Sequence, residues 1–268
     1  MSSFWLVLLG MFSGTAAGLL AGLIGFGGGV VIVPVVFYGL VKAGTPADQA
    51  AHVAVGTSLA AILPAALVSS LAHWRAGNTD IRFFREWGPG IVTGVVVAQL
   101  AAPHVRGSVM TGIFALLCLT FATRFAFPSR FGRVLERPPA GSFRGIAGTA
   151  IGLCSGLAGV GGGILTNIVM TLSGMPMHKS IGRAAAAGVV VSLPATLVAA
   201  VASGASAPTR LGSIDIAVWM AIAPAQAAAA WFGARLAQRV AADSLSRIVA
   251  VALLATGAVM LCSSLTGH

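Results

Sequence analysis

The chain has 268 residues, of which 57% are hydrophobic and only 8% are charged, and its mean hydropathy is +0.95. A soluble domain carries about 25% charged residues, so this composition excludes an ordinary soluble protein and is typical of a membrane protein. The net charge of +10 does not indicate nucleic-acid binding, because the basic residues lie in short stretches between apolar runs with few aromatic neighbours.

The first apolar run, at residues 4–24, follows no basic segment, so we interpret it as mature structure and not as a cleaved signal peptide. A transmembrane helix needs about 20 apolar residues. Six later segments are in that range, at 50–72, 87–103, 107–127, 184–202, 214–234 and 245–264, whereas those at 29–41, 145–158 and 163–174 are shorter. We therefore predict an all-α polytopic membrane protein.

One pattern of five pieces occurs twice along the chain. At an offset of 134 residues, the glycines at 14, 18 and 22 align with those at 148, 152 and 156. The stretch LPAALV at 63–68 is similar to LPATLV at 193–198, and TDI at 79–81 is similar to IDI at 214–216. These echoes in the same order predict two membrane repeats, 1–127 and 145–268, joined by a linker at 128–144.

Each repeat contains a glycine-rich turn, GFGGG at 25–29 and GVGGG at 159–163, between two of its pieces. If each glycine unit crosses the membrane once, the basic residues divide nine to seven between the two sides. If each unit enters and leaves on one side, three of the 16 basic residues (Lys42, Arg106 and Arg210) lie opposite the other 13. The uneven division obeys the positive-inside rule.

The charge division thus predicts that each repeat is a glycine-broken helical hairpin followed by three transmembrane helices. Both termini are then extracytoplasmic, the linker is cytoplasmic, and the even number of crossings makes the two repeats inverted, as in many secondary transporters. The sequence leaves open whether the hairpins are re-entrant or cross the membrane fully. It also leaves the oligomeric state unknown, because a helix face of small residues serves packing within or between chains.

The glycine turns predict an anion site. Irregular backbone at membrane depth persists only where it is buried or lines a polar cavity, and glycine lets backbone N–H groups approach a ligand. New helices start at Val30 and Ile164, and their first N–H groups and positive dipole ends favour an anion. The predicted backbone contacts come from Gly27, Gly28, Gly29 and Val30, and from Gly161, Gly162, Gly163 and Ile164. The alternative is that these glycines only allow close helix packing.

The stretches GFGGGVVIVP and GVGGGILTNI, with AVGTSLAAILPA at 54–65, resemble the TauE/SafE family over about residues 4–264. This resemblance implies transport of small anions such as sulfite, sulfonates or thiosulfate across the bacterial cytoplasmic membrane. Gly56-Thr57-Ser58 matches the family pattern, whereas the second half has Gly188-Val189-Val190 and lacks the two hydroxyls.

Four polar side chains within apolar runs complete the candidate substrate site: Thr57, Ser58, Asn167 and Gln226. For each of them, a hydrogen bond within or between helices is the alternative role. The three cysteines are scattered through apolar runs, and we predict no metal site, no cofactor and no catalytic residue. The acidic residues all lie in loops or at segment edges, so no carboxylate for proton coupling is evident within the membrane.

These observations predict a transporter that exports sulfite or an organosulfonate, with the anion and the lipid bilayer as its partners. Uptake of a sulfur anion such as thiosulfate is the alternative direction, and it requires a coupling ion. A noncatalytic membrane assembly subunit is a further alternative. An intramembrane enzyme is disfavoured, because neither Ser58 nor Ser155 has a histidine or acid at membrane depth to activate it.

Overall fold

The computed structural model describes residues 3–126, 139–201, 209–237 and 242–266. The first half contains α1 (Ser3–Ile24), α2 (Gly29–Lys42), α3 (Ala47–Arg75), α4 (Ile81–Ala101), the short 3₁₀ helix η1 (Ala102–His104) and α5 (Gly107–Ala126). The second half contains α6 (Gly141–Ala158), α7 (Gly163–Leu172), α8 (Met177–Val201), β1 (Arg210–Leu211), β2 (Ile214–Asp215), α9 (Ile216–Leu236) and α10 (Ala242–Thr266). The prediction of an all-helical protein is confirmed, apart from the two-residue strands.

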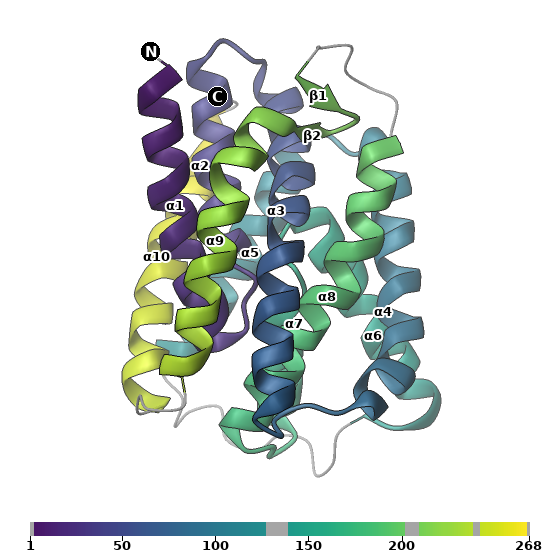
Figure 1. Cartoon of the computed structure of the whole chain (residues 1–268). Coiled ribbons are helices and arrows are strands. Elements are labelled where there is room, and N and C mark those ends of the chain that lie inside the picture. The colour runs from purple at the N-terminus through teal and green to yellow at the C-terminus, as the bar shows by residue number, and fades with distance from the viewer. Residues whose placement is uncertain (1–2, 127–138, 202–208, 238–241, 267–268) are drawn as a thin grey trace.

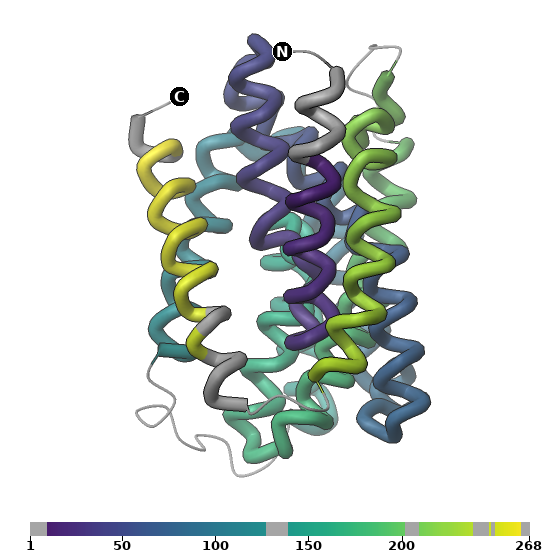
Figure 2. Tube along the Cα trace, turned by 60° about the vertical axis from the view of Figure 1, so that its left-hand side comes forward, coloured from purple at the N-terminus to yellow at the C-terminus, as the bar shows by residue number. Residues whose placement is uncertain are grey.

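The helices run roughly parallel to one axis and form a single bundle (Figure 1). Helix α1 begins and α10 ends at the same end of this bundle, which we call the terminal end (Figure 2). From there α1 runs into the bundle and α2 returns, whereas α6 and α7 form the same kind of hairpin from the opposite end. Each glycine unit thus enters and leaves the bundle at one end, the first at the terminal end and the second at the opposite end.

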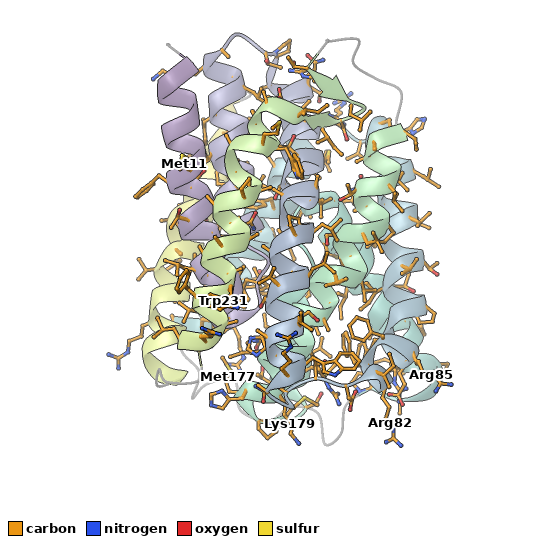
Figure 3. The ribbon with its side chains drawn as sticks, in the orientation of Figure 1. Met11, Arg82, Arg85, Met177, Lys179 and Trp231 are labelled. Atoms are coloured by element: carbon orange, nitrogen blue, oxygen red, sulfur yellow. The ribbon has the colours of Figure 1, made fainter. Side chains whose placement is uncertain are left out.

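Basic side chains collect at the end opposite the terminal end. Arg82, Arg85 and Lys179 project from it in Figure 3, and we call it the basic end. Arg144, at the start of α6, pairs there with Glu86 of α4, with 2.8 Å between Nη1 and Oε2. Residues 128–138 of the predicted linker lie outside the described residues, and α6 begins at Gly141, four residues before the predicted start of the second repeat at 145.

Four helices, α3, α5, α8 and α9, are long and apolar enough to cross a membrane. Two other segments predicted as full spans belong to α4 and α10, which do not meet this standard within the described residues. Large apolar side chains are exposed around the sides of the bundle, including Phe12, Leu116, Met220 and Phe232. At the basic end of α9 the Arg235 guanidinium lies 3.6 Å from the Trp231 ring centroid, a pair suited to a membrane interface.

The glycines aligned at the start of each repeat lie where two helices touch. A Cβ atom added at Gly14 of α1 would lie 2.6 Å from the Ile222 backbone oxygen of α9. Gly18 and Gly22 face the carbonyls of Gln226 and Ala230, each about one helical turn further along α9. In the second half, Gly152 of α6 packs in the same way on the Ile91 carbonyl of α4. Small residues at these positions let the backbones approach closely enough for van der Waals packing at membrane depth.

The echo between TDI and IDI marks two helix starts. Asp80 caps α4 by accepting a hydrogen bond from Phe83 N, and Asp215 caps α9 by accepting one from Val218 N, each at 3.1 Å. Aspartate is a preferred N-cap because its carboxylate satisfies an amide that the helix leaves free. The antiparallel β1–β2 hairpin before α9, with Arg210 opposite Asp215, is not predicted from the sequence, because strands of two residues carry no periodic signal.

Candidate functional site

The two glycine units form turns with the same backbone conformation at matched positions. Three glycines of the first turn have left-handed φ values: Gly25 at 78°, Gly27 at 74° and Gly28 at 78°. The second turn has 73° at Gly159, 72° at Gly161 and 74° at Gly162. A residue with a Cβ disfavours this region, so glycine is required there by backbone conformation and not only by close helix packing.

The two turns meet in the buried centre of the bundle. A Cβ added at Gly29 would lie 2.9 Å from Val160 Cα, and one added at Gly163 would lie 3.1 Å from Phe26 Cα. A Cβ added at Gly27 would lie 3.7 Å from Gly161 Cα, and one added at Gly161 would lie 3.8 Å from Gly27 Cα. The structure thus holds the two turns in direct contact, whereas the N-cap glycines face other neighbours: Gly28 faces Ala17 and Gln226, and Gly162 faces Val191 and Ser155.

Ile62 of α3 packs against both turns. Its side-chain methyl groups lie 3.1 Å from the positions that a Cβ would take at Gly27, Gly29 and Gly161, and the residue has no exposed surface. The isoleucine therefore fills the space beside the junction of the turns. Nothing in its sequence context distinguishes it from the other apolar residues of that span.

Breaking a helix frees carbonyl oxygens at its end, and at membrane depth these need donors from within the protein. Near the first turn, Gln226 Nε2 of α9 donates to Gly27 O at 2.7 Å, and Asn167 Nδ2 of α7 donates to Ile24 O at 3.5 Å. The His73 ring of α3 lies with Nε2 3.4 Å from Gly22 O. Two predicted anion ligands, Asn167 and Gln226, thus each donate one N–H group to the backbone of the first glycine unit.

The second unit has a corresponding set of donors. Ser58 Oγ of α3 donates to Gly159 O at 3.0 Å, and Gln99 Nε2 of α4 donates to Gly156 O at 2.8 Å. Thr57 plays a different part, because its Oγ1 accepts a hydrogen bond from Asp215 N at 2.9 Å and ties α3 to β2. All four predicted polar side chains are buried, and each has a backbone partner.

Backbone N–H groups remain at the starts of α2 and α7. Gly28 and Gly162 are the N-cap residues, and neither cap is made by a side chain. The Gly28 carbonyl accepts from Val31 N at 3.0 Å and the Gly162 carbonyl accepts from Thr166 N at 3.0 Å. Within the described residues, no backbone carbonyl accepts a hydrogen bond from the amides of Gly29, Val30, Gly163 and Ile164. These N–H groups and the helix dipoles make both starts favourable for negative charge.

Some buried polar atoms near the turns have no partner among the described residues, including Gln226 Oε1, Asn167 Oδ1 and Ser155 Oγ. Ser155 lies on α6, and its Oγ is 3.5 Å from the position of a Cβ at Gly162. Ser155 is not among the residues predicted to bind the anion, although its place one helical turn before Gly159 is a signal that it faces the glycine unit.

The histidines divide into two kinds. Both ring nitrogens of His52 lie within 3.0 Å of backbone carbonyls, so this ring joins α3 to the segment around η1. His73 lies near the end of α3, but only 2% of it is exposed, and its Nδ1 has no partner among the described residues.

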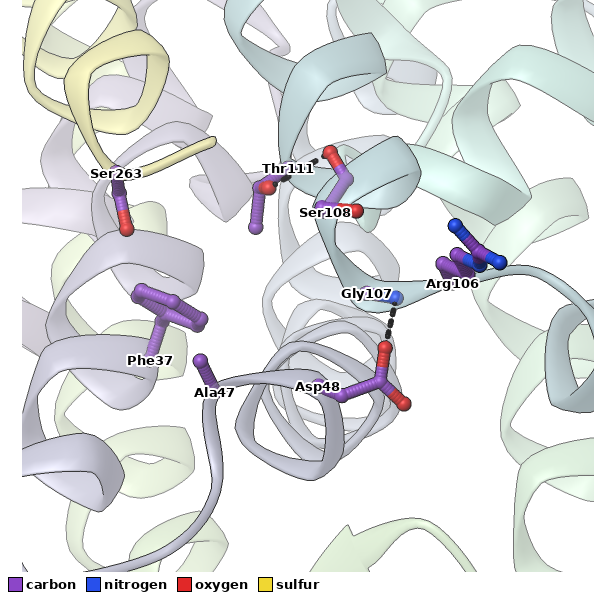
Figure 4. A pocket seen from close by; sticks show the side chains of 8 residues that line it. All are labelled: Phe37, Ala47, Asp48, Arg106, Gly107, Ser108, Thr111 and Ser263. Atoms are coloured by element: carbon purple, nitrogen blue, oxygen red, sulfur yellow. Dashed lines mark hydrogen bonds between the residues drawn. The ribbon is translucent and has the colours of Figure 1, made fainter. Parts of the chain in front are cut away.

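A separate pocket of about 240 Å³, with both apolar and polar side chains in its lining, lies beside the start of α5 (Figure 4). Its lining includes Asp48, Arg106, Ser108 and Thr111. Asp48 Oδ1 accepts a hydrogen bond from Gly107 N at 2.5 Å, so a carboxylate already occupies the amide end of α5. This contact locks α3 to α5 and opposes binding of a second anion there.

Apolar helices of membrane length around a buried junction of two broken helices define a polytopic membrane transporter. Residues 10–260 match the model of the family described as sulfite exporter TauE/SafE, and the chain belongs to this family. It is thus a member of a transporter family and not an enzyme.

Related proteins support this assignment. The chain is 31% identical to a probable membrane transporter protein of Haemophilus influenzae over 190 residues, and this alignment covers 71% of this chain and 72% of that protein. It is 32% identical over 192 residues to a probable membrane transporter protein of Bacillus subtilis, covering 64% and 68%. A probable membrane transporter protein of Methanocaldococcus jannaschii is 25% identical over 223 residues, covering 78% and 79%. No solved structure matches the chain.

Proposed function

We propose that this protein exports small sulfur-containing anions, sulfite or an organosulfonate, across the bacterial cytoplasmic membrane. The observation that carries the proposal is the buried meeting of two glycine turns, each followed by a helix whose first amides are available to an anion. The family description, sulfite exporter, supports the class of substrate.

The proposed binding site lies between the two turns, where the N-cap glycines Gly28 and Gly162 begin α2 and α7. The direct contact between the two turns corresponds to a closed barrier, and the anion binds when the two glycine units move apart. Alternating access of this kind suits inverted repeats at 1–127 and 145–268. The matched φ values of the turns and the matched glycine packing of α1 on α9 and α6 on α4 support this relation.

The orientation follows from the charges. The basic end faces the cytoplasm, since positively charged loops are retained inside. The terminal end faces outward; α2 ends there at Lys42, Arg106 precedes α5, and Arg210 begins β1. Export in this orientation is driven by the membrane potential. An inside-negative potential of 100 mV favours the exit of each negative charge by about 2.3 kcal/mol, or about a fifty-fold concentration ratio.

The test is flux of sulfite from liposomes that contain only this protein, with variants matched for the amount inserted. Gly28→Val and Gly162→Val should each abolish flux, because a branched side chain enters a left-handed turn whose Cβ position is already crowded. Gly39→Val is the control, since Gly39 lies in α2 with no atom near its Cβ position. Normal flux in both turn variants would show that the site lies elsewhere. Absence of flux for every sulfur anion with the unaltered protein would favour an assembly subunit.

A further inference from the structure

The two helix starts at the junction are not chemically equivalent. We infer that the start of α7 binds the oxyanion of the ligand, that the start of α2 accepts a hydrogen bond from it, and that the preferred substrate is therefore a small oxyanion carrying its own hydrogen-bond donor. This inference rests on the proposed function and specifies the substrate class of the same site.

The α7 start presents donors. Ser155 has no exposed surface, its Oγ has no partner among the described residues, and it lies 3.5 Å from the Cβ position of the N-cap Gly162. A hydroxyl can turn its proton toward a ligand. At the same helix start, the amides of Gly163 and Ile164 donate to no backbone carbonyl among the described residues. Three donors at the positive end of a helix dipole are suited to a sulfonate or sulfite group.

The α2 start has free amides as well, at Gly29 and Val30, but beside them it presents a side-chain acceptor. Gln226 Nε2 donates to Gly27 O at 2.7 Å, and this bond fixes which way the amide points, since an amide oxygen in that place would meet another oxygen. Gln226 Oε1 is consequently free, and it has no partner among the described residues although the residue is completely buried. A buried acceptor without a donor is unfavourable, so a ligand that supplies an O–H or N–H group is favoured there.

A metal cation is the other kind of ligand that a free amide oxygen attracts. The position of Gln226 argues against it, because the amide nitrogen lies 2.8 Å from the Cβ position of Gly28, at the positive end of the α2 dipole. The described residues also contain no cluster of three or more histidine, cysteine or acidic side chains that could hold a metal. An O–H or N–H group of an anionic ligand is neutral, so the positive end of the helix dipole does not repel it, and it needs no cluster of metal ligands.

The experiment compares 2-hydroxyethanesulfonate with propane-1-sulfonate, which have the same number of heavy atoms and differ by a hydroxyl in place of a methyl group. Each is tested as a competitor of sulfite flux in proteoliposomes. The unaltered protein should bind the hydroxyl compound at least about fivefold more tightly, the factor that one hydrogen bond of about 1 kcal/mol gives.

Variants separate the two helix starts. Gln226→Met should bring the ratio of the two affinities close to one, because methionine keeps the length of the side chain and removes the amide oxygen. Gln99→Met is the matched control, since it removes an equivalent bond to Gly156 O away from the N-caps and should preserve the ratio. Ser155→Ala should lower the affinity of the protein for both sulfonates by the same factor.

Equal affinity of the unaltered protein for the two sulfonates would overturn the inference even if the variants fail to fold. A preference that survives in Gln226→Met would also overturn it, as would sodium-dependent flux that this variant loses, which would assign the amide oxygen to a cation. Absence of flux for sulfite and both sulfonates would instead overturn the proposed function and this inference with it.

Discussion

Alanine substitutions of single glycines test whether the turns are required as backbone conformations. In Gly28→Ala the new residue would have a φ of 78°, which costs an L-amino acid about 1–2 kcal/mol. Its Cβ would lie 2.7 Å from Ala17 O and 2.8 Å from Gln226 Nε2, so neighbouring backbone must move as well. Gly162→Ala has a φ of 74° and a Cβ 2.6 Å from Val191 Cγ2. Each variant should lose at least about 2 kcal/mol of stability.

The control, Gly39→Ala, changes a helical glycine with open space around its Cβ position. It should gain about 1 kcal/mol, the difference in helix propensity between the two residues. Thermal unfolding in detergent measures these effects, and a loss of about 2 kcal/mol corresponds to a fall of roughly 4–8 °C in Tm for a chain of this size. If Gly28→Ala and Gly162→Ala are as stable as Gly39→Ala, the left-handed turns are not needed and the reasoning from the glycine pattern is wrong.

Cysteine tags at both chain ends should react from outside in intact cells, and a tag at one end that reacts only after lysis would contradict the predicted topology. Efflux from proteoliposomes should follow an imposed potassium-diffusion potential; flux that follows only the pH gradient would contradict this and make His73 the first residue to replace. Thr57→Val should lower stability by about 1–3 kcal/mol, because it leaves the buried Asp215 amide without its acceptor, while flux per folded molecule stays the same. Ile62→Ala should cost about 2–5 kcal/mol and also permit anion leak, whereas Leu59→Ala, at an equally buried position in α3, should cost stability alone; equal leak in the two variants would remove the special role of Ile62.

Much of the fold is predictable because apolar length and loop charge act locally. The prediction of two hairpins that open to one end each depends only on where basic residues lie, and α2 and α7 begin within one residue of the predicted helix starts. The partners of the polar residues are not predictable in this way. Ser58 reaches Gly159, 101 positions away, and Gln226 reaches Gly27, 199 positions away, so their targets depend on the packing of whole helices. The sequence identifies the residues of the junction, but not which of their atoms remain free.

The hydrogen bonds around the turns connect the two halves of the chain. The first unit receives donors from Asn167 and Gln226, and the second receives donors from Ser58 and Gln99, so each half completes the broken helix of the other.

This exchange has a consequence for biogenesis. The first half enters the membrane before the ribosome has made Asn167 and Gln226, the donors for the Ile24 and Gly27 carbonyls. Until then these carbonyls lack those hydrogen bonds, and an unpaired carbonyl at membrane depth is unfavourable in free energy. The first hairpin therefore reaches its final form only after the last helices insert, and a chain truncated at the linker is a natural target for membrane quality control. Two halves synthesised as separate polypeptides carry complementary donors and acceptors, and their co-expression is expected to restore the pairing that neither achieves alone.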